Sequence, residues 1–149
     1  MSAPPPDGIA GDALEAKLAA MGYAISSLDD LGEGYGFRKI RVPLGVTAFG
    51  VNAVVMPPGY EGFLHYHDTQ DELYFVHSGT ARFEVGGETR ELEPGSVVHV
   101  ESTTPRRFSN AGEDDLVVLV VGGKGGYVER DGHLVDPERD LERRRAFGS

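Results

Sequence analysis

Hydrophobic and polar residues alternate along much of this chain with the two-residue period of a β-strand. Ala81, Phe83 and Val85 share one face of a predicted strand, and Arg82 and Glu84 take the opposite face. Glycine pairs and Pro-Gly pairs fit the turns between such segments. Strands are predicted within residues 37–44, 47–56, 59–79, 80–85, 89–93, 96–101 and 116–121. Many short strands separated by glycine turns predict an all-β sandwich or barrel.

A helical pattern occurs near the beginning of the chain. Leu14, Leu18 and Met21 recur at the spacing of one helix face, and Asp12 with Glu15 can form a capping box. A short N-terminal helix is therefore predicted. The expected organisation is a disordered N-terminus, the helix with a loop, one β-barrel domain and a C-terminal tail, over residues 1–11, 12–35, 36–135 and 136–149.

Composition supports a single domain and narrows the classes of partner. The chain has 149 residues, enough for one core, and its 21 glycines suit many turns. A formal net charge of −10 opposes binding to nucleic acid or to anionic membranes. The first residues lack the basic start and apolar core of a secretory signal, and no apolar run could span a bilayer. We therefore predict a cytoplasmic protein.

Two histidines and a carboxylate stand close together in the central segment. His65 and His67 are two residues apart, so on a strand both imidazoles leave the same face, and Glu72 follows a short polar turn. The chain has no cysteine, so any metal must be held by nitrogen and oxygen ligands. Two imidazoles and one carboxylate suit iron, manganese, nickel or zinc and leave coordination positions open.

The spacing of five residues in this segment resembles the first signature motif of the cupin superfamily. Gly59, His65, His67, Glu72 and Gly79 match it at every fixed position, and a looser resemblance covers roughly residues 36–123. The resemblance implies a single cupin jelly-roll β-barrel. It also implies that the two histidines and the glutamate hold one divalent metal, with a third histidine supplied by a second motif.

Neighbouring residues compete for roles in this site. Asp71 is an alternative to Glu72, but the six-residue gap to Gly79 favours Glu72. Tyr74 shares the face of Glu72 and is expected either to line the pocket as a substrate-binding residue or to be a core tyrosine with a bonded hydroxyl. By the same alternation His77 faces outward.

The second cupin motif departs from the family pattern. Asn110 keeps its place, but Arg106 stands where the third histidine ligand is expected. An arginine cannot bind a metal because it stays protonated. Three alternatives follow. The site has three ligands, and Arg106 binds an anionic substrate. Or Arg106 pairs with Glu72 and no metal binds. Or His99 moves in as a substitute ligand.

The segment after the predicted barrel strands is assigned no part in the site. Residues 124–135 are predicted to form a further hairpin with Asp131-Gly132 at its turn, which places His133 near a turn. The tail after this hairpin can begin a short helix, with Pro137 at the first position.

Taken together, these residues indicate a small metal-binding cupin that binds or converts a small, anionic organic ligand. The alternative is a metal-free cupin that binds or senses a small molecule. The resemblance implies dioxygenase, isomerase, cyclase and lyase activities alike, and no catalytic residue is assigned. Residues 116–121 are apolar on both faces, and a strand of that kind needs cover on both sides. We therefore also predict a homodimer.

Overall fold

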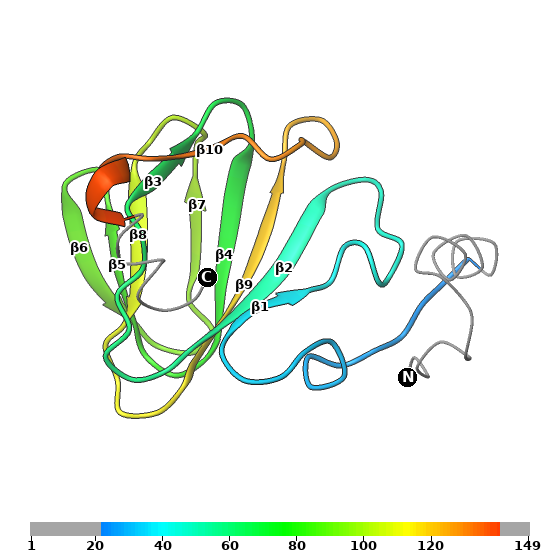
Figure 1. Cartoon of the computed structure of the whole chain (residues 1–149), viewed down its shortest axis with the longest axis horizontal. Coiled ribbons are helices and arrows are strands. Elements are labelled where there is room, and N and C mark those ends of the chain that lie inside the picture. The colour runs from blue at the N-terminus through cyan, green and yellow to red at the C-terminus, as the bar shows by residue number, and fades with distance from the viewer. Residues whose placement is uncertain (1–21, 141–149) are drawn as a thin grey trace.

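Two antiparallel sheets of five strands each make up most of the structure, a computed structural model that describes residues 22–140 (Figure 1). The strands are β1 (Gly36–Lys39), β2 (Gly50–Met56), β3 (His65–His67), β4 (Asp71–Ser78), β5 (Ala81–Val85), β6 (Glu88–Leu92), β7 (Val97–Val100), β8 (Arg106–Asn110), β9 (Leu116–Gly123) and β10 (Gly132–Leu134). One sheet has the order β1-β2-β9-β4-β7 and the other β10-β3-β8-β5-β6. The predicted all-β jelly roll is confirmed.

Helical structure is scarce in the part of the chain that is described. Residues 137–140 form one helical turn that begins at Pro137. The helix predicted from residue 12 lies outside the described residues. Within residues 22–140, no helix has the length and hydropathy to cross a membrane.

The hydrophobic core lies between the two sheets. Tyr74 of β4 packs its ring against Phe83 of β5 and Phe108 of β8, with centroid separations of 5.1 and 5.4 Å. Leu116 and Val118 of β9 are also buried in this core. Inward-facing residues of strands from both sheets thus meet in one core, as the two-residue alternation predicts.

Gly79, the last glycine of the first motif, makes a connection that another residue could not make without strain. Its φ angle is +82°, and a Cβ atom there would lie 2.5 Å from the carbonyl oxygen of Asp115. This close approach holds the end of β4 against the start of β9. The glycine at the end of the motif therefore has a local structural cause.

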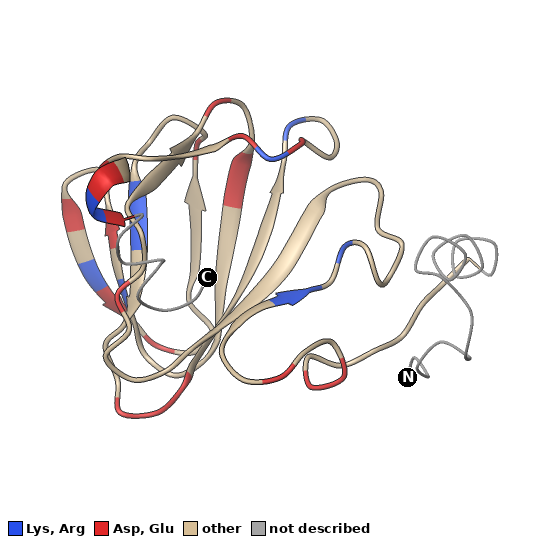
Figure 2. Ribbon diagram, in the orientation of Figure 1, with Lys and Arg blue, Asp and Glu red and all other residues tan. Residues whose placement is uncertain are grey.

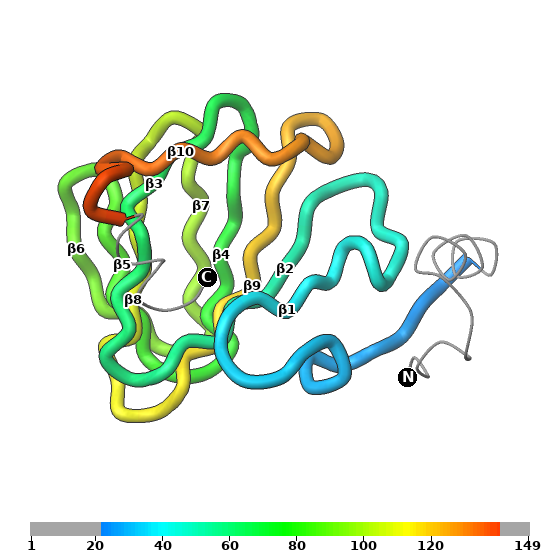
Figure 3. The backbone as a smooth tube through the Cα atoms, viewed as in Figure 1, coloured from blue at the N-terminus to red at the C-terminus, as the bar shows by residue number. Residues whose placement is uncertain are grey.

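The hairpin predicted for residues 124–135 is not formed. After β9 the chain crosses the top of the barrel in the view of Figures 1 and 3, and residues 132–134 then pair with β3 in the opposite sheet. Gly132 lies opposite His67, and Leu134 opposite His65. Asp131-Gly132 thus leads into an added edge strand, because β3 offers an unpaired edge that a local hairpin would leave exposed.

Candidate metal centre

His65, His67 and Glu72 converge between the two sheets. The histidines come from β3 and the glutamate from β4 of the facing sheet, and one potential ligand atom of each lies within 4.8 Å of the others. His67 and Glu72 are buried, and His65 is partly buried. The acidic start of β4 and the basic start of β8 lie at the same end of the barrel (Figure 2). This end of the interior is therefore polar and charged.

Hydrogen bonds fix which nitrogen of each histidine is available to a ligand. His65 Nδ1 lies 3.0 Å from the carbonyl oxygen of Phe63, and His67 Nδ1 lies 2.9 Å from Asp131 Oδ1. Both partners only accept, so each Nδ1 carries a proton and donates it. In a neutral ring this leaves the lone pair on Nε2. The Nε2 atoms of His65 and His67 lie 3.8 and 2.9 Å from Glu72 Oε1.

The buried Nε2 atom of His67 has no hydrogen-bond partner among the described residues. It faces a carboxylate oxygen, and two unprotonated acceptors at 2.9 Å repel each other unless a cation or proton lies with them. A lone pair from each of two imidazoles and a carboxylate oxygen form a donor set that suits a divalent transition metal. The residues present therefore fit the metal that the cupin resemblance implies.

The electrostatics of the pair Glu72 and His67 favour their charged forms. Burial raises the pKa of Glu72, but the polar contacts with His65, His67 and Tyr74 outweigh it and hold that pKa well below its usual range. Burial lowers the pKa of His67, but Glu72 and the bond to Asp131 outweigh it, so the pKa of His67 is raised. In the absence of metal, a proton on His67 neutralises the repulsion between the two groups.

Tyr74 lies between this polar end and the core. Its hydroxyl donates to Glu72 Oε1, and the residue is only 2% exposed. Burial and the charge of Glu72 raise the pKa of Tyr74 well above its ordinary value, so it stays a neutral donor. The hydroxyl proton is already donated to Glu72. Of the two roles expected for Tyr74, this arrangement is that of a core tyrosine with a bonded hydroxyl.

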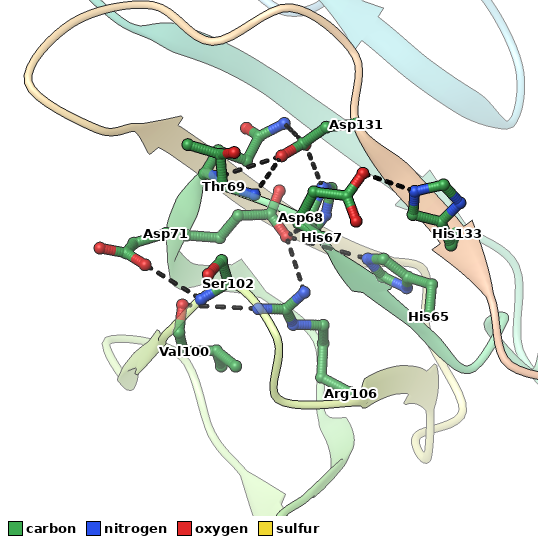
Figure 4. A network of polar contacts seen from close by, with 12 residues as sticks. His65, His67, Asp68, Thr69, Asp71, Val100, Ser102, Arg106, Asp131 and His133 are labelled. Carbon is green, nitrogen blue, oxygen red and sulfur yellow. Dashed lines mark hydrogen bonds and ion pairs between the residues drawn. The ribbon is translucent and has the colours of Figure 1, made fainter.

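Arg106 lies beside the three potential ligands and is completely buried. It is paired in register with His65. Its Nη2 donates to the carbonyl oxygen of Glu101 at 2.9 Å and to that of Val100 at 3.5 Å, and Figure 4 shows the contact with Val100. Its Nη1 lies 3.9 Å from Glu72 Oε1, which is beyond hydrogen-bond length. Neither Nη1 nor Nε has a hydrogen-bond partner among the described residues. The buried guanidinium of Arg106 therefore has N–H groups that are available to donate to a ligand.

Two of the competing residues lie elsewhere. His99 is exposed and opposite Leu73, so it faces away from the interior to which its neighbour Val100 and Glu72 point. Asp71 accepts from the backbone N–H of Ser102 and forms an ion pair with Lys124 at 3.0 Å. The structure therefore brings neither His99 nor Asp71 to the cluster.

Asp131 belongs to the site, although sequence reasoning assigned it to a turn. Burial raises its pKa, but hydrogen bonds from Gln70, Thr69 and His67 hold it well below the usual range. The carboxylate is therefore charged and accepts the Nδ1 proton of His67. An Asp-Gly pair is common in turns, so its sequence carried no signal for this role.

Comparison with known families identifies the class of protein. Residues 52–122 match the family model described as a cupin domain. A cupin protein from Bacteroides fragilis has a similar crystal structure, with a TM-score of 0.60 at 24% identity, covering 72% of this chain and 89% of that one. Residues 52–122 thus carry a cupin domain, and the fold is similar to that of a cupin protein of known structure.

Curated relatives match a shorter part of the chain. An uncharacterised protein of Streptomyces coelicolor is 50% identical over 52 residues, which are 35% of this chain and 49% of that protein. An oxalate-binding protein of Thermotoga maritima is 30% identical over 66 residues, which are 44% of this chain and 54% of that protein. The match spans about half the length of each of these relatives.

Proposed function

We propose that this cupin holds one divalent transition metal (iron, manganese, nickel or zinc) with His65, His67 and Glu72. The observation that carries the proposal is the buried Nε2 atom of His67, which lacks a hydrogen-bond partner within residues 22–140 and lies 2.9 Å from Glu72 Oε1. When bound, the metal supplies a Lewis acid and a template for substrate oxygens. The protein's part is to hold three ligand atoms within 4.8 Å of one another.

The ligand of this site is a small organic anion, and Arg106 recognises it. A divalent cation and Arg106 bring three positive charges against the two negative charges of Glu72 and Asp131, so an anion is needed to neutralise a buried site. The Nη1 and Nε atoms of Arg106 lack partners among the described residues, and either can donate a charge-assisted hydrogen bond to a carboxylate. The name of the Thermotoga maritima relative, an oxalate-binding protein, supports a small carboxylate.

Metal analysis of protein purified without chelator tests the metal site. We expect about one equivalent of metal in the wild type, none after His67→Ala, and an unchanged amount after His99→Ala, which removes an exposed histidine from the outer face. Equal occupancy in the wild type and His67→Ala would contradict the proposal. Binding of oxalate without any metal, measured by calorimetry, would instead favour the metal-free binding protein.

We also propose that the chain forms a homodimer through the outer face of β4, β7 and β9. Leu73 and Val97 are 43% and 63% exposed there, and Leu119 of the apolar strand β9 is only partly covered. An apolar sheet face of this kind favours association. Sedimentation should give the mass of two chains for the wild type and of one chain for Val97→Glu. A monomeric wild type would refute this assembly.

A further inference from the structure

The three-residue strand β3, which carries both histidines, is held mainly by a segment far away in the sequence. On one edge β3 shares a single register pair, His65 with Arg106, and one further backbone bond, from His67 N to Ser102 O at 2.8 Å. On the other edge β10 pairs with all three of its residues. Two further backbone bonds extend this pairing, from Asp68 N to Asp131 O at 3.3 Å and from Val135 N to Leu64 O at 3.0 Å. We call residues 131–135 the C-terminal strap.

Each oxygen of the Asp131 carboxylate accepts two hydrogen bonds. Oδ1 accepts from His67 Nδ1 at 2.9 Å and from Gln70 Nε2 at 2.7 Å. Oδ2 accepts from the backbone N–H groups of Thr69 and Gln70 at 2.6 and 3.0 Å. These donors surround the carboxylate, which is 13% exposed, and stop it from turning away from His67 (Figure 4).

The strap also packs its backbone against the imidazole of His67. A Cβ atom at Gly132 would lie 3.2 Å from His67 Cε1 and 3.5 Å from Nδ1. The absence of a side chain at this position leaves room for the ring. The ring is thus held by a hydrogen bond to Asp131 and by contact with the backbone of the next residue.

From this arrangement we propose that Asp131 is a positioning residue for the metal ligand His67 and that the C-terminal strap completes the site. Asp131 keeps the proton on Nδ1 and so presents the lone pair of Nε2 toward Glu72. The metal-affinity part of this inference rests on the proposed function. Groups that orient a metal ligand in this way typically change metal affinity by about 10–100-fold.

Asp131→Asn is the sharpest variant, because an amide cannot satisfy four donors. Its NH₂ group must face either the Nδ1 proton of His67 or the backbone donors of Thr69 and Gln70, so one side sets a donor against a donor. The matched control is His133→Ala. It removes the exposed 2.7 Å ion pair with Asp68 and the stacking of His133 on Tyr66, which join the same two segments, and leaves Asp131 intact.

Cobalt(II) titration, followed by its visible absorption, measures affinity and ligand geometry together. We expect Asp131→Asn to weaken Co²⁺ binding by at least about tenfold and to alter the spectrum, with His133→Ala within about threefold of wild type. Wild-type affinity in folded Asp131→Asn, or an equal loss in both variants, would overturn the inference.

A measurement on the metal-free wild type keeps the inference testable if the variant does not fold. ¹⁵N NMR of the His67 ring, recorded at a pH where the ring is neutral, should show the proton on Nδ1. A proton on Nε2 would overturn the inference whatever the metal results. If the wild type binds no Co²⁺ and yet shows the Nδ1 proton, the proposed function fails and the positioning of His67 by Asp131 stands.

Discussion

The two ends of the barrel interior differ in how well their buried groups are satisfied. Away from the first residues of β4 and β8, residues such as Val76 and Phe108 pack in the apolar core. Toward the near end, the same strands bring Glu72 and Arg106 together with His67 of β3. Of the five buried side-chain polar atoms without a partner within residues 22–140, three belong to His67 and Arg106.

This contrast indicates that the apolar end stabilises the fold and that the polar end recognises a ligand. Buried polar atoms are nearly always hydrogen-bonded in native proteins, so unpaired ones gathered at one end indicate a site that a ligand completes. The apolar end supplies the burial that holds the sheets together. Tyr74 joins the two, since its ring packs on Phe83 and its hydroxyl donates to Glu72. Changes at the two ends should therefore have separable effects.

The largest effect on stability should come from the apolar end. Phe83→Ala removes a ring that is 4% exposed and leaves a cavity, so the free energy of unfolding should fall by about 3–5 kcal/mol. Metal affinity of the folded variant should stay within about threefold of wild type. Urea unfolding of metal-free protein and Co²⁺ titration measure the two quantities. A large loss of affinity in folded protein would show that the ends are not separable.

At the polar end, Arg106→Met should affect ligand binding more than stability. It keeps the bulk of the buried side chain but removes the donors, so carboxylate binding should weaken by about 1.5–3 kcal/mol, the usual worth of a hydrogen bond to a charged group. Metal binding should be retained, because Arg106 repels the cation. Calorimetry with oxalate, with and without metal, provides the test. Unchanged oxalate affinity would remove Arg106 from the ligand site.

Metal affinity should depend on pH through His67. Its pKa is raised in the folded protein, mainly because Glu72 outweighs the effect of burial, and the metal must displace the proton. Below that pKa, affinity should fall by about tenfold for each pH unit, and the fall should begin at a higher pH than for a free imidazole. Titrations at several pH values, with proton release measured by calorimetry, check this. Metal affinity that stays constant as the pH falls through the pKa of His67 would contradict the assignment of His67 as a metal ligand.

The smallest effect is expected at the boundary between the ends. Tyr74→Phe keeps the ring in the core but removes the donor to Glu72, so metal-free protein should lose about 1 kcal/mol of stability. The metal-bound protein should lose less, because a bound cation also compensates the carboxylate. Thermal unfolding with and without metal measures the difference. No loss in either state would argue that Tyr74 acts only through packing.

The sequence predicted local features of the site better than distant ones. Alternation along a strand correctly placed Glu72 and Tyr74 on one inner face, because a two-residue period depends only on the chain itself. The facing of His99 depended on a turn that the pattern did not define. Asp131 was missed because its role arises from pairing between β10 and β3, 64 residues from His67 along the chain. Pairing of that kind is set by tertiary structure, which local propensity does not encode.

The proposed site requires a cation lying among His65, His67 and Glu72. A crystal structure of protein soaked with Mn²⁺ or Zn²⁺, with anomalous data collected at the metal's absorption edge, tests this. We predict one anomalous peak between the Nε2 atoms of the two histidines and the carboxylate of Glu72, with Arg106 turned to an anion beside it. A site with no peak, in which Arg106 Nη1 closes its 3.9 Å separation from Glu72 to a hydrogen bond, would contradict the account.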